Sequence, residues 1–208
     1  MSLYEKTLNE FLELAASKSP TPGGGSVSAV VGTHAAAMVC MVANLTLGKK
    51  KYEEVQAAAI DILSGASEAI ASLKELTAQD MAAFEQVMIA WRAPGETEEE
   101  RASKARALTE AAIIATQVPL EIARTCLRVL ELAARLAPIG NQTAISDVGV
   151  AAYLADAALR SALLSVDINL PSLGQDAYRD EALAEKNALL KASEELKAAC
   201  LAEVAKRL

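Results

Sequence analysis

A long stretch without charge, residues 19–47, constrains the fold more than any other part of the sequence. It opens Ser-Pro-Thr-Pro-Gly-Gly-Gly-Ser and contains no Asp, Glu, Lys or Arg. Pro20 and Pro22 hold its beginning extended, because a residue that precedes proline is pushed out of the α region. Residues 26–47 are rich in Ala and Val and predict a helix, and a helix that is apolar on all sides is normally buried.

The two ends of this predicted helix favour the binding of an anion or an electron-rich group. Gly23, Gly24 and Gly25 leave no Cβ atoms over the N–H groups that follow, and a helix start carries a partial positive charge. Three lysines, 49–51, come just past the far end. Two other interpretations stay open, a flexible glycine joint before a plain core helix and a membrane span. The stretch also contains Gly, Ser, Thr, Asn and His, which favours a helix inside a bundle.

The composition predicts a single all-α domain over residues 1–208. Hydrophobic residues make up 52% of the chain but aromatic residues only 3%, so Ala, Leu, Val and Ile must build the core. Ser2 and Glu5 match a capping box that opens a first helix, and a kink or break is expected before Pro119. No strand-like alternation is present. We expect a bundle of about six or seven helices around a buried central helix.

Charge and cysteine usage narrow the class of protein. The formal net charge of −7 argues against non-specific nucleic-acid binding, which needs clustered cations. Cys40, Cys126 and Cys200 are odd in number and widely spaced, as expected of reduced thiols in a cytoplasmic protein. A single histidine and the absence of Cys-x-x-Cys leave no recognisable zinc site. No targeting segment is expected at the N-terminus, which has no apolar signal core.

Asp80 is the first candidate for chemistry. It lies within a helical pattern, with Leu76, Ala83 and Phe84 at neighbouring helical positions, which places it toward the apolar side. A carboxylate there is costly unless it is paired, so Asp80 is a candidate for a shifted pKa and for acid–base work. The alternative is a carboxylate at the surface or at a helix contact.

Three further features each have a structural alternative. Asn141, Ser146 and Asp147 lie at or near the start of a later helix, where plain N-capping is a sufficient explanation. The lysine run is either a solvated face or a source of one lysine that points into a site. His34 lies among alanines in mid-helix, which predicts a hydrogen-bonded core histidine. No P-loop or dinucleotide-binding fingerprint is present.

Several motifs together closely resemble the cyclodeaminase/cyclohydrolase family of folate enzymes. Two carry most of the resemblance, Ser-Pro-Thr-Pro-Gly-Gly-Gly-Ser at 19–26 and Met-Val-Ala-Asn-Leu-Thr-Leu-Gly-Lys-Lys-Lys-Tyr at 41–52. Further matches lie at 80–84, 87–88, 118–120, 140–141 and 145–151, so the resemblance spans nearly the whole chain. The family includes the C-terminal domain of formiminotransferase-cyclodeaminase and stand-alone bacterial methenyltetrahydrofolate cyclohydrolases. Ser165 and His34 depart from its pattern.

The resemblance implies a helical homodimer without metal or redox cofactor that acts on the one-carbon unit between N5 and N10 of tetrahydrofolate. A cyclohydrolase adds water to the methenyl carbon and forms 10-formyltetrahydrofolate. A cyclodeaminase lets N10 attack the 5-formimino carbon and releases ammonia. We expect the cyclohydrolase first, because no formiminotransferase domain accompanies the sequence. The alternative from another class is an inactive folate-binding or scaffold domain.

The resemblance also implies roles for the candidate residues. Asp80 or Asp147 stabilises the methenyl cation and takes a proton from water. Lys50 donates a proton to the departing nitrogen or binds the folate carboxylates. The expected substrate, a folate with a polyglutamate tail, is held by Gly23, Gly24, Gly25, Ser26, Lys51, Asn141 and Ser146. Neither nucleic acid nor membrane is an expected partner.

Overall fold

The computed structural model describes residues 3–174 and 177–208 and, within them, contains helices and no strand. The α-helices are α1 (Leu8–Ala15), α2 (Gly24–Thr46), α3 (Gln56–Arg92), α4 (Glu98–Leu136), α5 (Ile145–Asn169) and α6 (Ala177–Ala205). Short 3-10 helices are η1 (Leu3–Glu5), η2 (Lys50–Val55), η3 (Gln142–Ala144) and η4 (Leu170–Leu173). The prediction of an all-α bundle of about six or seven helices is confirmed.

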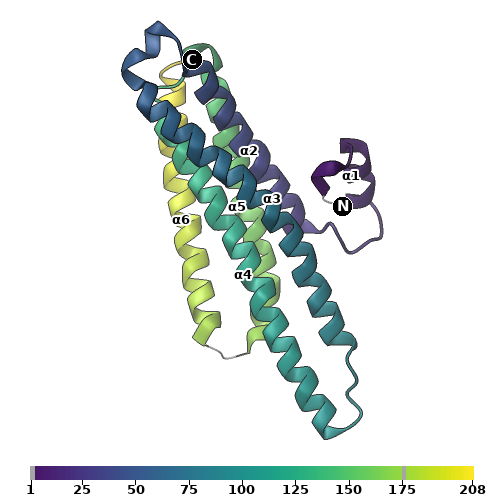
Figure 1. Ribbon diagram of the computed structural model, residues 1–208. Helices are drawn as coiled ribbons and strands as arrows, with labels where there is room; N and C mark the ends of the chain where they lie inside the picture. The colour runs from purple at the N-terminus through teal and green to yellow at the C-terminus, as the bar shows by residue number, and fades with distance from the viewer. Residues whose placement is uncertain (1–2, 175–176) are drawn as a thin grey trace.

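Helices α2 to α6 run side by side and form the bundle (Figure 1). Helix α2 packs between α3 and α5, and α4 packs against α3 and α5 and also contacts α2. Small and aliphatic side chains fill the core, as the scarcity of aromatic residues requires; Val39, Ile62, Leu136 and Ile145 are among the largest that are fully buried. Helix α4 continues through Pro119 as one helix, so of the predicted kink or break before Pro119 the break is wrong.

Helix α1 lies beside α2, outside the bundle (Figure 1). Its N-terminal cap is Thr7, which forms a capping box with Glu10; Ser2 lies outside the described residues, and Glu5 belongs to η1. No residue of α1 is buried, although its sequence is amphipathic. The segment before it is tied to the bundle by the Tyr4 hydroxyl, which lies 2.9 Å from Thr33 Oγ1 and 3.2 Å from Thr77 Oγ1.

Helix α2 is central, but one of its sides is open to solvent. His34 and Leu45 are exposed on that side. His34 Nδ1 lies 2.8 Å from the carbonyl oxygen of Val30, so the predicted hydrogen bond is present. The prediction that His34 belongs to the core is wrong, because α3, α4 and α5 cover only part of the circumference of α2.

Two segments, α2 and Gln142–Leu173, are long and apolar enough to cross a membrane by length and composition. In each, 56% of the apolar window is buried inside the bundle, and core helices of water-soluble proteins pass the same test.

A polar cluster joins α5 to α6 and gives a stability prediction. Asp156 is buried and accepts hydrogen bonds from Arg160 Nε (2.8 Å), Ser193 Oγ (2.6 Å) and Lys197 Nζ (2.9 Å). Burial by itself raises the pKa of Asp156, but these three donors outweigh it and lower the pKa below its ordinary value. The ionised carboxylate therefore stabilises the fold above the ordinary Asp pKa of about 3.9, and this contribution is lost as the pH falls through the lowered pKa.

Replacing Asp156 by alanine should lower the free energy of unfolding by about 2–3 kcal/mol at pH 7, because Lys197 and Ser193 lose their buried partner. Urea denaturation followed by circular dichroism measures the loss. The matched control is Glu194→Ala, whose exposed carboxylate also meets Arg160 and Lys197 and whose loss should cost less than about 1 kcal/mol. Equal losses for the two variants would contradict a stabilising role for the buried carboxylate.

Candidate active site

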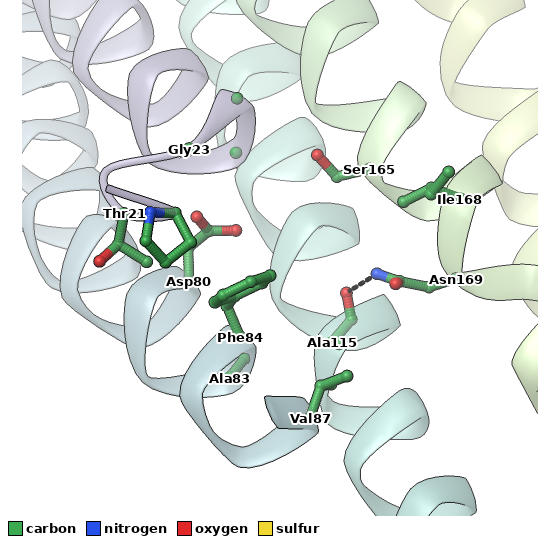
Figure 2. Close-up of a pocket in the computed structure, with 13 residues that line it drawn as sticks. Thr21, Gly23, Asp80, Ala83, Phe84, Val87, Ala115, Ser165, Ile168 and Asn169 are labelled. Carbon is green, nitrogen blue, oxygen red and sulfur yellow. Dashed lines mark hydrogen bonds between the residues drawn. The ribbon is translucent and has the colours of Figure 1, made fainter. Parts of the chain in front are cut away.

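A pocket of about 370 Å³ lies at the N-terminal end of α2. Its floor includes Ala115 of α4, and its walls come from α3 and α5 (Figure 2). The lining residues are Pro20, Thr21, Gly23, Gly24, Gly25, Asp80, Ala83, Phe84, Val87, Ala115, Ser165, Ile168 and Asn169.

The start of α2 is held by a carboxylate from another helix. Gly23 occupies the N-cap position and offers no side chain to the first N–H groups. Asp80, on α3, points at this end (Figure 2) and accepts hydrogen bonds from the Ser26 hydroxyl, at 2.6 Å, and from the Ser26 backbone N–H. The position at the helix start that the sequence predicted for a ligand anion is therefore filled by Asp80. Ser26 is buried and positions Asp80.

Gly25 makes this approach possible. A Cβ atom built on Gly25 would lie 2.1 Å from Asp80 Oδ1, far inside any real contact distance. Gly24, the next residue toward the N-terminus, has no atom within 4 Å of the equivalent position. Within the glycine run, Gly25 is therefore the residue that close contact with Asp80 requires.

The electrostatics of Asp80 suit acid–base work. Burial raises the pKa of Asp80, and the hydrogen bonds from Ser26 offset only part of this effect. Among residues 3–174 and 177–208, no Lys, Arg or His forms an ion pair with Asp80. A carboxylate whose pKa is shifted toward neutrality, with no resident cation, can take up a proton and can stabilise a cation brought by a ligand.

Apolar and amide groups form the rest of the wall. Phe84, one turn after Asp80, lies across the pocket from Ile168 of α5 (Figure 2), and both are exposed to solvent. Asn169 Nδ2 donates to the Ala115 carbonyl oxygen at 2.6 Å, and Ser165 lies one helical turn earlier. The sequence indicated Phe84 only as a helix-face residue and gave no role to Ile168 or Asn169. For this wall of the pocket, the one available signal in the sequence was the four-residue spacing of Ser165 and Asn169, which places both on one face of a helix.

The remaining predicted site residues lie at the other end of α2. Lys50 and Lys51 belong to η2, just past the C-terminal end of α2. A helix of 23 residues is about 35 Å long at 1.5 Å per residue, so within one chain this end is remote from Asp80. A second pocket of about 460 Å³ lies there, and its lining includes Lys50, Lys51, Tyr52 and Arg207.

Local hydrogen bonds explain the arrangement of this second region. Asn141 is buried; its Oδ1 accepts from Thr143 N–H at 3.0 Å and its Nδ2 donates to the Leu45 carbonyl oxygen at 2.7 Å. Both polar atoms of Asn141 thus have partners within the chain, as the capping interpretation requires. The N–H of Gln142 donates to the Tyr52 hydroxyl at 2.9 Å and lowers the pKa of that phenol.

The other members of this group are more open. Lys51 Nζ donates to Gln142 Oε1 at 3.2 Å, whereas Lys50 is exposed and forms no ion pair with a described residue. Ser146 is exposed and Asp147 half-buried, both in the first turn of α5. Within residues 3–174 and 177–208, no three or more His, Cys, Asp or Glu side chains lie together so that they could hold a metal ion.

Several known proteins are similar to this chain in sequence. The formiminotransferase-cyclodeaminase family profile matches residues 7–188. The chain is 44% identical over 185 residues to a methenyltetrahydrofolate cyclohydrolase of Methylorubrum extorquens, covering 89% of each chain. It is 32% identical over 180 residues to the formimidoyltransferase-cyclodeaminase of Mus musculus, of which it spans 33%.

A solved structure gives the same result. The formiminotetrahydrofolate cyclodeaminase of Thermotoga maritima superposes with a TM-score of 0.83 at 34% identity, over 99% of this chain and 96% of that one. The family profile covers most of the sequence, and the related structure covers nearly all of it. The chain therefore belongs to the formiminotransferase-cyclodeaminase family.

Proposed function

We propose that this protein hydrolyses 5,10-methenyltetrahydrofolate to 10-formyltetrahydrofolate, with Asp80 as the group that acts on the reacting carbon. The observation that carries the proposal is the Asp80 carboxylate, which has a raised pKa and no resident cation and lies on the wall of a pocket with apolar sides. The relative in Methylorubrum extorquens, which is similar over most of both chains, is named for this activity.

The reaction matches the chemistry of the pocket. The substrate carries a positive charge spread over N5, the methenyl carbon and N10, which an unpaired carboxylate stabilises. Asp80 takes one proton from a water molecule as the water oxygen bonds to the carbon. The resulting tetrahedral carbon then loses its bond to N5, and the electron pair of that bond stays on N5, which takes up a proton. The hydroxyl group on the carbon gives up its proton as it becomes the carbonyl of the formyl group, which remains on N10. One water molecule is consumed and one proton is released overall.

The side walls have a separate role in this proposal. Phe84 and Ile168 offer two apolar surfaces between which the flat pterin ring fits, and aromatic stacking favours this placement. Asn169 and Ser165 supply polar groups on the same wall of the pocket, one helical turn apart. No electrons are transferred and the methenyl carbon is already electrophilic, so the reaction calls for neither a redox cofactor nor a metal ion.

A second activity uses the same groups. The relatives in Mus musculus and Thermotoga maritima are named for cyclodeaminase activity, in which N10 attacks the formimino carbon and ammonia leaves. A carboxylic acid with a raised pKa would donate the proton that departing ammonia needs, so Asp80 suits this reaction as well. The third candidate, an inactive folate-binding scaffold, predicts binding without turnover.

One assay separates the three candidates. Purified protein is mixed with 5,10-methenyltetrahydrofolate, and its near-ultraviolet absorbance is followed against a buffer blank. We expect decay well above the blank, with 10-formyltetrahydrofolate as the product. If methenyl-folate persists but forms from 5-formiminotetrahydrofolate with release of ammonia, the protein is a cyclodeaminase. Folate binding without either reaction would support the scaffold.

The proposal extends to location and partners. We place the protein in the cytoplasm, as a homodimer that takes folates with polyglutamate tails. The exposed Lys50 and its neighbours support the binding of a polyglutamate tail, because an acidic chain needs a local cationic surface to hold a row of carboxylates. Recovery from the soluble fraction without detergent tests the location, and comparison of KM for mono- and polyglutamylated substrate tests the tail.

A further inference from the structure

One amide side chain on the wall of the Asp80 pocket is held in a fixed orientation. Asn169, the last residue of α5, is half-buried and lines the pocket. Its Nδ2 donates to the backbone carbonyl oxygen of Ala115, on α4, at 2.6 Å (Figure 2). A carbonyl oxygen can only accept a hydrogen bond, so the NH2 group of the amide must face Ala115. The Oδ1 atom of Asn169 is therefore left for a different partner.

Pro119 explains why the Ala115 carbonyl is available. In an α-helix a carbonyl accepts from the N–H four residues later, and four residues after Ala115 stands Pro119, which has no N–H. Pro119 is buried inside α4, and the helix continues through it. The Ala115 carbonyl thus lacks its usual helical donor, and Asn169 supplies one from α5. Because a buried carbonyl without a donor is costly, this hydrogen bond is favoured over the reverse orientation of the amide.

The oxygen of this amide has no partner in the part of the chain that the structure describes. No residue among 3–174 and 177–208 donates a hydrogen bond to Asn169 Oδ1. The nearby walls are formed by Phe84 and Ile168, whose apolar side chains have no hydrogen to donate. An acceptor left unpaired in a filled pocket lowers affinity, so Oδ1 favours a ligand that brings an N–H or O–H group to this wall.

A pterin ring carries such a donor at its far end. Its pyrimidine half has a 2-amino group, which lies at the opposite end of the ring system from the one-carbon unit. Asp80 and Asn169 are likewise on opposite walls of the pocket, and Phe84 and Ile168 are the apolar surfaces proposed for the ring faces (Figure 2). A ring that brings its methenyl carbon to Asp80 therefore directs its pyrimidine half toward Asn169.

We propose that Asn169 recognises the pterin by accepting a hydrogen bond from its 2-amino group, and that Pro119 fixes the orientation of the amide by leaving the Ala115 carbonyl to it. In the reverse orientation, the NH2 group of Asn169 would meet the 2-amino group, and two donors would face each other. Asn169 is thus a specificity-determining residue. Pro119 is a positioning residue that acts through Ala115 and Asn169. This proposal rests on the proposed function.

A substrate without the 2-amino group tests the recognition. Wild-type protein is assayed with 5,10-methenyltetrahydrofolate and with the analogue in which a methyl group replaces the 2-amino group. The wild type should lose about 10- to 100-fold in kcat/KM on the analogue, because Oδ1 is then left unpaired. Asn169→Leu has a similar size and no acceptor, so its two values should agree within about threefold. Its KM for the natural folate should rise about tenfold with kcat little changed, since this contact is equally present before and during the reaction.

Pro119→Ala tests the orientation of the amide. The new N–H gives the Ala115 carbonyl its helical donor, and the proline ring no longer pushes that carbonyl aside. The variant should unfold at the wild-type temperature or above it, while its discrimination between the two folates falls at least about threefold. In an Asn169→Leu background the same change should not alter the discrimination further. Gln117→Ala, at an exposed residue of α4 that does not line the pocket, is the matched control and should change neither property.

Several results would overturn the proposal. If Asn169 only ties α5 to α4, then Asn169→Leu lowers the unfolding temperature and leaves the preference between the two folates unchanged. A fall in kcat at constant KM, or undiminished discrimination in Pro119→Ala, counts against it as well. Equal rates of the wild type on the two folates also overturn it, and this result needs no variant that folds.

Failure of the proposed function is a separate result. A wild-type protein that turns over neither methenyl- nor formimino-folate is not the proposed enzyme, but its recognition of the pterin can still be measured. Calorimetry then compares the dissociation constants of 5-formyltetrahydrofolate and of its analogue with a methyl group in place of the 2-amino group. A preference of about tenfold or more for the natural folate that is lost in Asn169→Leu supports the role of Asn169, and equal affinities overturn it.

Discussion

Replacing Asp80 by asparagine is expected to lower kcat for methenyl-folate hydrolysis by about 10²–10⁴-fold, the usual contribution of a positioned acid–base group. The amide cannot take a proton from water, and it does not stabilise the cationic carbon. Asparagine retains the size of the side chain and can still accept the hydrogen bond that Ser26 donates at 2.6 Å. The variant is assayed at saturating substrate, with binding measured separately by fluorescence or calorimetry.

Stability and pH dependence distinguish this role from a structural one. Since burial raises the pKa of Asp80, its ionised form destabilises the fold at neutral pH, and the free energy of unfolding of Asp80→Asn should equal or exceed that of the wild type. The wild-type rate should fall as the pH drops through the raised pKa, above the ordinary value of about 3.9, because the base becomes protonated. An Asp80→Asn variant that folds and keeps its rate would contradict the role of Asp80 as the general base. An Asp80→Asn variant that fails to fold would contradict it as well, because the side chain would then serve the fold.

The helices were predictable from the sequence because their signals are local. The apolar periodicity of α3 and the absence of charge in α2 follow from neighbouring residues, and the same reasoning placed Asp80 toward the apolar side, where the structure has it half-buried. The open side of α2 was not predictable in this way. Whether a helix that is apolar all round is fully covered depends on how many neighbours reach it.

The candidate site was harder to predict because it depends on helix length and on contacts between distant residues. The glycine and lysine motifs were correctly placed at the two ends of one predicted helix, but the length of that helix, about 35 Å, separates them too far for both to line one pocket within one chain. The contact between Ser26 and Asp80 joins α2 to α3 across 54 residues, which moves Ser26 from ligand binding to the support of a carboxylate. Asn141 is engaged in local hydrogen bonds, so for this residue the capping interpretation accounts for both polar atoms.

Replacing Gly25 by alanine is expected to lower the rate by about 10²-fold or more, because the contact between α2 and Asp80 leaves no room for a Cβ atom. The new atom would lie 2.1 Å from Asp80 Oδ1, so the carboxylate must swing away and lose its hydrogen bond to Ser26. Alanine by itself favours a helix, by about 1 kcal/mol over glycine. The helix should therefore form while the carboxylate is displaced, and steady-state kinetics together with thermal unfolding measure the two effects.

Gly24→Ala is the matched control for folding, since no atom lies within 4 Å of its added Cβ, and its unfolding temperature should not fall. The decisive comparison is a double-mutant cycle. If Gly25 acts only by making room for Asp80, then Gly25→Ala should cost almost nothing further in rate once Asp80 is asparagine, because the two changes remove the same group from the reaction. Additive losses would instead mean that Gly25 contributes through direct contact with the folate, and that the approach of Asp80 to the start of α2 is not what the glycine serves.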